Sequence, residues 1–147
     1  MPANYQIQPM VIEDYDKVLE LWRSAGGVGL NESDTRANIA AYLTRNPGMS
    51  FVARHGGKLV GAVLCGHDGR RGYLHHLAVA KAHRRLGLGR RLVQNCFDQL
   101  AAARILKCTI FLFADNDDGR SFWTRTGWAM RDDLQMLQKV LRQSPAV

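Results

Sequence analysis

The segment that most constrains the fold runs from Leu77 to Leu92 and changes character twice. It begins as an apolar run typical of a strand, passes through a loop containing Gly87 and Gly89, and continues as an amphipathic helix. The first N–H groups of a helix lack backbone partners, and the helix dipole adds roughly half a positive charge there. Glycines let an anion approach those groups, and the flanking arginines attract it. The segment therefore predicts a diphosphate-binding site between a strand and a helix.

Two other phosphate-binding loops fit this segment less well. A dinucleotide-binding loop needs a third glycine or alanine where this chain has Leu92, and a nucleotide-triphosphate loop needs a GxxxxGK[ST] pattern that the chain lacks. The remaining alternative is a solvated, arginine-rich helix start whose glycines are incidental.

Hydrophobic periodicity predicts the elements around this segment. Helices are expected at 14–22, from about 33 to before Pro47, through Leu92 to Leu100, and around 119–126. Tight turns at His55-Gly56-Gly57 and Asp68-Gly69-Arg70-Arg71-Gly72 join the middle strands into an antiparallel meander. A helical crossover then leads to a parallel strand at 107–113. We therefore expect an α/β chain with a mixed sheet and helices on both faces. The expected strands are Tyr5–Pro9, Ser50–Arg54, Lys58–Cys65, Tyr73–Val79, Lys107–Phe113 and Leu134–Leu141.

Composition and charge narrow the class of protein. The 147 residues are 46% hydrophobic and 22% charged, which is typical of one globular domain, here residues 1–147. The start has no signal core and no apolar run approaches the ~20 residues of a membrane span, so a cytoplasmic protein without a membrane partner is expected.

The net charge is +7, and without four clustered arginines it would be 16 − 13 = +3, so a polyanionic ligand is expected at that cluster. The cluster is Arg84, Arg85, Arg90 and Arg91.

The cysteines do not indicate a disulfide or a metal site. Cys65, Cys96 and Cys108 are an odd number, form no CxxC pair and lie in apolar stretches, where a reduced thiol acts as a small hydrophobic side chain. We expect no bound metal, since ligand clusters are missing from the sequence.

Two motifs at the expected separation resemble those of the GNAT superfamily of acetyl-coenzyme A (acetyl-CoA)-dependent N-acetyltransferases. The pattern Arg/Gln-x-x-Gly-x-Gly/Ala is met by Arg84, Gly87 and Gly89, and the hydrophobic strand end before it by Leu77-Ala78-Val79. The second motif is met by Asn116, the aromatic pair Phe122-Trp123 and the pair Gly127-Trp128. The resemblance covers essentially the whole chain and is greatest to small single-domain bacterial members.

The resemblance implies a fold, a donor and a reaction. The sheet would be mostly antiparallel with six to seven strands. The acetyl group of acetyl-CoA, a donor substrate, would pass directly to a primary amine in a ternary complex; the amine could be a protein N-terminus, a lysine or a small amine. The residues implied for coenzyme binding are Leu77, Ala78, Val79, Arg84, Arg85, Leu86, Gly87, Leu88, Gly89, Arg90, Asn116, Phe122 and Trp123.

The catalytic groups are less completely matched. By the same likeness, the backbone N–H near Val79 would stabilise the oxyanion. The family commonly has a tyrosine acid where this chain has Trp123, whose indole does not titrate usefully, so water, Tyr73 or Ser121 would have to replace it. His75 is the candidate base; simple strand alternation puts it on one face with Leu77 and Val79, and His76 on the other. A half-buried histidine with a purely structural role remains the alternative.

Acidic residues are expected to mark the side that receives the amine. Glu32 and Asp34 lie between the first two helices and Asp132 lies before the last expected strand, regions that frame the acceptor groove in this family. Two rival functions remain: a coenzyme A-binding regulatory module that has lost turnover, suggested by Trp123, and a nucleic-acid-binding domain that uses the arginines. We expect a small-molecule or peptide acceptor, no nucleic acid, and a monomer or homodimer.

Overall fold

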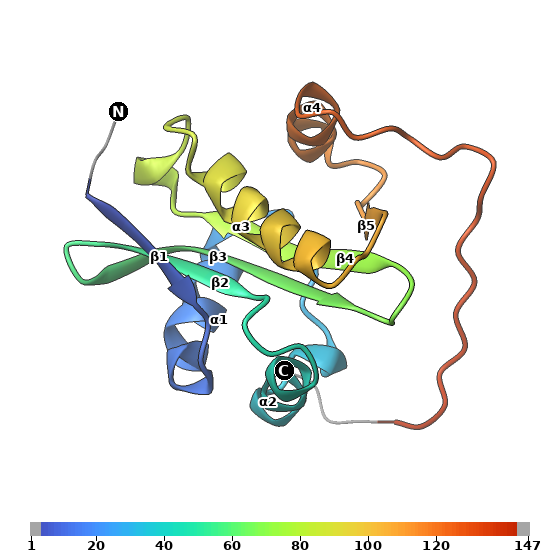
Figure 1. Cartoon of the computed structure of the whole chain (residues 1–147), viewed down its shortest axis with the longest axis horizontal. Helices are drawn as coiled ribbons and strands as arrows, with labels where there is room; N and C mark the ends of the chain where they lie inside the picture. Colours follow the sequence, from blue (N-terminus) through green and yellow to red (C-terminus); the bar gives the residue numbers. More distant parts are fainter. Residues whose placement is uncertain (1–3, 144–147) are drawn as a thin grey trace.

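The computed structural model describes residues 4–143, which form one sheet with flanking helices (Figure 1). Within these residues no helix is both long and apolar enough to cross a bilayer. The elements in chain order are β1 (Tyr5–Pro9), η1 (Ile12–Asp14), α1 (Tyr15–Ala25), η2 (Glu32–Asp34), α2 (Arg36–Arg45), β2 (Phe51–His55), β3 (Lys58–His67), β4 (Gly72–Val79), η3 (Lys81–His83), α3 (Leu88–Ala102), β5 (Cys108–Ile110) and α4 (Asp117–Arg125).

The sheet has the strand order β1-β2-β3-β4-β5. The first three junctions are antiparallel, and β4 pairs with β5 in parallel after the α3 crossover. The predicted mixed, mostly antiparallel sheet is therefore confirmed, including the hairpin at Gly56-Gly57, where both glycines have a positive φ. The described residues contain five strands, so the expectation of six to seven is wrong.

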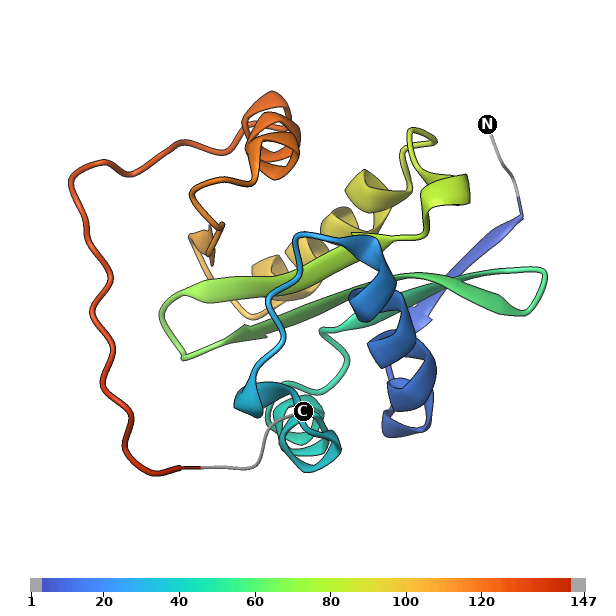
Figure 2. The same cartoon turned by 180° about the vertical axis from the view of Figure 1, so that it is seen from behind.

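Helices cover both faces of the sheet, as predicted (Figures 1 and 2). On one face α1 and α2 bury Val18, Trp22 and Ile39 against the sheet. On the other face α3 buries a second cluster that includes Leu92 and Cys96. Each cluster removes a helix's apolar stripe from water, which holds the layers together.

All three cysteines are free thiols, as predicted from their number and surroundings. Cys65 and Cys96 are fully buried, and Cys108 is half-buried. Burial raises the pKa of Cys108 to about 12, so this side chain remains a neutral thiol at physiological pH. The thiols therefore pack as small apolar groups.

Two of the expected strands differ from prediction, and both lie toward the C-terminal end. The strand expected at Lys107–Phe113 is reduced to β5, and Leu134–Leu141 forms no strand but an exposed, irregular segment. A strand is stable only when its backbone groups pair with a neighbour, and alternating side chains do not provide that neighbour. The alternating pattern at Leu134–Leu141 thus predicted a strand, but this segment pairs with no strand among residues 4–143.

Candidate active site

The half of β4 nearest its C-terminal end has an open edge. β5 pairs only with Gly72, Tyr73 and Leu74, so the strand beyond them has β3 on one side and no strand of the described chain on the other. The N–H of Ala80 donates to the Val60 carbonyl at 2.8 Å, and because successive N–H groups alternate in direction, the N–H of Val79 points to the open side. An extended ligand can therefore pair with β4 as an additional strand.

A β-bulge interrupts β4 at this edge. Ala62 pairs with Ala78, but Leu64 pairs with His75, so β4 contains an extra residue there. His76 takes up the irregularity with a φ of 56°, in the left-handed region.

The bulge overturns the expected division of side chains between the two faces. The rings of His75 and His76 both lie on the α1/α2 face, against Tyr42 and Trp22 respectively. Leu77 instead packs with the cluster on the α3 face. The prediction that His75 shares a face with Leu77 was wrong, because it assumed strict alternation along the strand.

Asp34 forms a buried pair with His76. Its carboxylate is 3.0 Å from the Nε2 atom of His76, and its residue is 4% exposed. The same side chain accepts the Asn31 N–H at 3.1 Å, and the Trp22 indole donates to the His76 carbonyl at 2.9 Å. Asp34, expected on the acceptor side as a surface acid, is thus the partner of a histidine on β4. Such a partner fixes the orientation of the imidazole.

His75 lies in a group of aromatic rings beside this pair. Its ring is nearly parallel to those of Tyr73 and Phe111, with centroids 6.3 and 6.2 Å away, and Tyr42 approaches edge-on at 6.3 Å. Burial, with a smaller contribution from His76, lowers the pKa of His75 from its ordinary value, against the opposing effect of Asp34. His75 is therefore a neutral imidazole at pH 7, the form that can accept a proton.

The helix α3 begins after a glycine loop, as the sequence predicted, and its first turn has no side-chain cap. Gly87 precedes the helix in the left-handed conformation, with a φ of 79°, and no side chain caps the first turn. A Cβ built on Gly89 would lie 3.4 Å from Phe122 and 3.9 Å from Leu77. Gly89 therefore marks the place where α3, α4 and the open edge of β4 meet.

The Arg84 side chain makes two hydrogen bonds within the chain, which the sequence did not predict. Its Nε donates to the Val79 carbonyl at 2.9 Å, and its Nη2 donates to the Ala25 carbonyl, also at 2.9 Å. The guanidinium thus links the end of β4 to the end of α1. Arg85, Leu86 and Arg90 are exposed around the start of α3.

The residues of the second motif lie on and before α4. Asn116 caps this helix, because its side-chain oxygen accepts the Gly119 N–H at 2.9 Å. Phe122 contacts Trp123 edge-to-face at 4.9 Å. Trp123 in turn packs edge-to-face on Trp128, with ring centroids 5.0 Å apart. Both tryptophans pack against the hydrophobic cluster beneath α3.

The acidic residues expected around the acceptor lie on two different segments of the chain. Glu32 is exposed on η2 close in sequence to the buried Asp34, whereas Asp132 lies exposed in the irregular segment after α4. Two contacts of His76 were not predicted from the sequence: its pair with Asp34 and the hydrogen bond from the Trp22 indole to its carbonyl. The sequence does contain an Asp on the α1–α2 connection and two adjacent histidines on one strand. The β4 bulge that turns both histidine rings toward this Asp cannot be recognised from the sequence.

Comparison with known proteins identifies relatives that align with most of the chain. The sequence profile of the acetyltransferase (GNAT) family matches residues 15–128. An acetyltransferase of Sodalis glossinidius is 27% identical over 129 residues, which covers 88% of this chain and 90% of that protein. An acetyltransferase of Yersinia pestis is 25% identical over the same length.

Solved structures with low sequence identity have the same fold. Ard1 from Thermoplasma volcanium has a TM-score of 0.77 at 18% identity, covering 88% of this chain and 85% of that chain. The PaiA N-acetyltransferase from Thermoplasma acidophilum, solved in complex with coenzyme A, also has a TM-score of 0.77, at 17% identity, covering 87% of this chain and 91% of that chain.

Proposed function

This chain belongs to the acetyltransferase (GNAT) family, and on that premise we propose that it transfers the acetyl group of acetyl-CoA directly to a primary amine in a ternary complex. One observation carries the proposal: the open edge of β4 meets the uncapped N-terminus of α3 at Gly89. The first feature suits an extended pantetheine arm and the second suits a diphosphate, and acetyl-CoA contains both.

The residues present fit the donor substrate. The free N–H groups of the first turn of α3 are donors for the diphosphate, and Arg85 and Arg90 add positive charge beside them. The backbone of Leu77 to Val79 offers its open side to the pantetheine arm. Bound acetyl-CoA supplies an activated thioester. The Val79 N–H then donates to the thioester oxygen as that atom gains negative charge.

The acceptor amine must lose a proton, and the two β4 histidines are the candidate bases. We assign this role to His75, because it is held neutral and lies on the α1/α2 face, opposite the helix that receives the diphosphate. His76, oriented by Asp34, is the alternative. Trp123 cannot protonate the departing thiolate, but a thiol with a pKa near 8.5 is a tolerable leaving group without an acid.

The acceptor class follows from the charges around these histidines. A cationic amine is attracted by the exposed Glu32 and by the Asp34–His76 pair, whereas the arginines on the coenzyme side repel it. A protein N-terminus, a lysine and a small amine all meet this requirement.

Two variants of one residue test the coenzyme site. Gly89→Glu places a negative charge against the diphosphate, and we expect coenzyme A binding to disappear in calorimetry. Gly89→Ala is the matched control: its Cβ makes an ordinary contact with Phe122, so binding should be largely kept. Wild-type affinity in Gly89→Glu would place the site elsewhere.

An amine screen separates the enzyme from its rivals. We expect free thiol to be released from acetyl-CoA when the correct amine is present. Coenzyme binding without thiol release for any amine would favour the regulatory module. Duplex DNA binding that falls steeply with salt, without coenzyme binding, would favour the nucleic-acid-binding domain.

A further inference from the structure

Three aromatic rings lie side by side where β4 and β5 diverge. β5 pairs with β4 as far as Leu74 and no further, so the two strands part beyond that residue. Tyr73 and His75 lie on either side of Leu74, and Phe111 is the first residue after β5. The three rings are nearly parallel, at angles of 9°, 9° and 17°, and their centroids are 6.3, 6.1 and 6.2 Å apart. We call these three side chains the aromatic platform.

The geometry of the platform differs from that of the aromatic pairs in the hydrophobic core. The rings of Trp123 and Trp128 meet edge to face with centroids 5.0 Å apart. Trp22 meets the His76 ring in the same way, also at 5.0 Å. In such a pair the edge of one ring covers the face of the other. The platform rings are parallel and farther apart, and three equidistant rings cannot form a single column. They therefore lie beside one another with their faces turned in the same direction, which suits a flat ligand.

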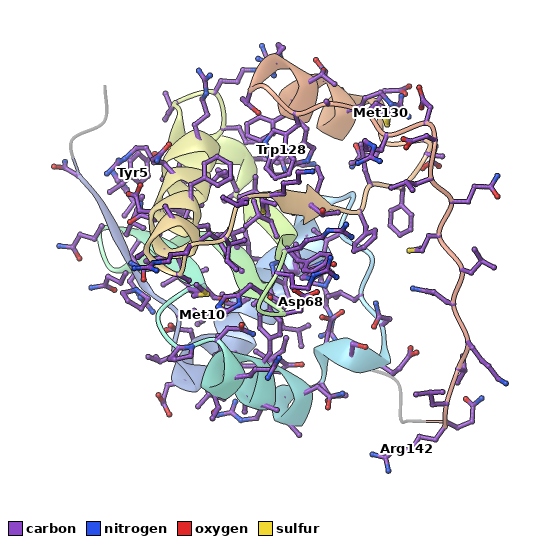
Figure 3. All side chains as sticks on the ribbon, turned by 45° about the vertical axis from the view of Figure 1, so that its right-hand side comes forward. Tyr5, Met10, Asp68, Trp128, Met130 and Arg142 are labelled. Carbon is purple, nitrogen blue, oxygen red and sulfur yellow. The ribbon has the colours of Figure 1, made fainter. Side chains whose placement is uncertain are left out.

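The platform is partly open to water. Phe111 is 58% exposed, and the other two rings are half-buried. Beyond Trp128 the chain passes outside the helices and the sheet, from Met130 near α4 to Arg142 at its far end (Figure 3), and pairs with no strand among residues 4–143. Aromatic side chains are the usual lining of small-molecule sites, and a ligand that covers Phe111 gains the free energy of removing its ring from water.

The platform borders the groups assigned to the acceptor amine. His75, the candidate base, is one of its three rings, and Tyr42 closes it on one side by approaching His75 edge-on at 6.3 Å. The His76 ring, held by the Asp34 carboxylate, lies 6.4 Å from that of His75. This carboxylate attracts a cationic amine. The site therefore offers an aromatic surface and a negative charge next to each other.

We propose that the platform selects acceptors that carry an aromatic ring two carbons from the amine, with this ring stacked on Tyr73 and Phe111 and the amine at the His75 imidazole. The inference rests on the proposed function and narrows its acceptor class. The His75 centroid is 6.3 Å from that of Tyr73 and 6.2 Å from that of Phe111, a separation that a two-carbon chain spans. A small arylalkylamine and a peptide whose first residue is aromatic both contain this arrangement, whereas a lysine side chain does not.

Two amines of equal chain length test the platform. 2-Phenylethylamine has a flat aromatic ring, and 2-cyclohexylethylamine has a saturated ring of similar size. Calorimetry measures the binding of each to the protein saturated with coenzyme A, which has no acetyl group to transfer. We expect 2-phenylethylamine to bind roughly 2- to 10-fold more tightly, because an aromatic pair contributes this much beyond the area that it buries.

Thiol release from acetyl-CoA then distinguishes the two sources of the ring. A tripeptide that begins with phenylalanine is compared with 2-phenylethylamine and with a tripeptide that begins with alanine. We expect both ring-containing acceptors to have a higher kcat/KM than the alanine tripeptide. Whichever of the two has the higher kcat/KM identifies the source as a peptide or a small amine.

Phe111→Leu and Phe113→Leu are matched variants. Both phenylalanines are 58% exposed, so neither substitution disturbs the fold. The Phe113 ring packs on a different element, since a Cβ built on Gly29 would meet it. We expect Phe111→Leu to lower the preference for 2-phenylethylamine about two-fold or more, and Phe113→Leu to leave it unchanged.

Equal binding of the two amines to the unmodified protein would overturn the inference. A preference that Phe111→Leu leaves intact, or that both variants lower equally, would overturn it too. If no amine released thiol from acetyl-CoA, the proposed function would be refuted instead, because the binding preference is measured without turnover.

Discussion

The Asp34–His76 pair gives a quantitative test of how the acceptor side is held. The Asp34 carboxylate meets two donors, the imidazole Nε2 at 3.0 Å and the Asn31 N–H at 3.1 Å. Asparagine has nearly the same shape but only one acceptor oxygen. In Asp34→Asn, one of the two donors therefore faces an NH₂ group instead of an oxygen, inside a site that is 4% exposed.

The expected cost follows from the bond that is lost. A hydrogen bond to a charged group contributes about 1.5–3 kcal/mol net, and a buried donor left without a partner lies at the upper end of that range. We therefore expect Asp34→Asn to lower the free energy of unfolding by about 2–3 kcal/mol and Tm by roughly 4–12 °C. Glu32→Gln is the control, because Glu32 lies exposed on the same short helix, and we expect it within about 0.5 kcal/mol of the wild type.

Urea unfolding followed by tryptophan fluorescence measures these differences, and the buried Trp22 ring, 5.0 Å from His76, reports on this site. A double-mutant cycle with His76→Gln isolates the pair, and we expect a coupling energy of about 1–3 kcal/mol. Equal stability of Asp34→Asn and the wild type, or a coupling energy near zero, would refute the reasoning that this pair anchors β4 to the α1–α2 connection.

Three further substitutions test other parts of the site. Asn116→Ala should lower the free energy of unfolding by about 1 kcal/mol through loss of the α4 cap, whereas Asn116→Asp keeps the cap and should lower only coenzyme affinity, by several-fold, in calorimetry. Arg84→Gln should lower the free energy of unfolding by about 1 kcal/mol in urea, since two bonds to carbonyls are lost. The lowered pKa of His75 means that the unfolded chain binds a proton more readily below pH 6.5 than the folded chain does. Stability should therefore be full above pH 6.5 and fall as the pH drops through it, and His75→Gln should flatten this dependence in urea titrations at several pH values. A slope unchanged in His75→Gln would assign the titration to another group.

The sequence predicted those parts of the fold and site that depend on local chemistry. The strand, the glycine loop and the helix around Gly87 and Gly89 follow from the conformational preferences of those residues, and all three are present. The uncapped first turn of this helix follows from the unpaired N–H groups at any helix start. The hairpin at Gly56-Gly57 and the two apolar helix faces follow in the same way.

The parts that were missed depend on contacts between distant segments. Asp34 is buried because η2 lies against β4, where His76 is 42 residues further along the chain. The two hydrogen bonds of the Arg84 side chain depend on carbonyls presented by other elements, and no pattern of side chains in the sequence predicts them. Residues 134–141 pair with no strand among the described residues, so their alternating pattern was insufficient to make them a strand.

The bulge in β4 links the two sides of the proposed reaction. In a regular strand, His75 and His76 would point to opposite faces, and only one of them could reach an amine entering beside α1 and α2. The extra residue at the bulge places both rings on that face and leaves Leu77 on the α3 face, next to Gly89. Trp22 and Asp34 hold the irregularity from outside the strand, through the carbonyl and the ring of His76. Loss of either anchor should therefore affect both the position of the acceptor base and the edge that receives the donor, although neither anchor lies at the helix start proposed to bind the coenzyme diphosphate.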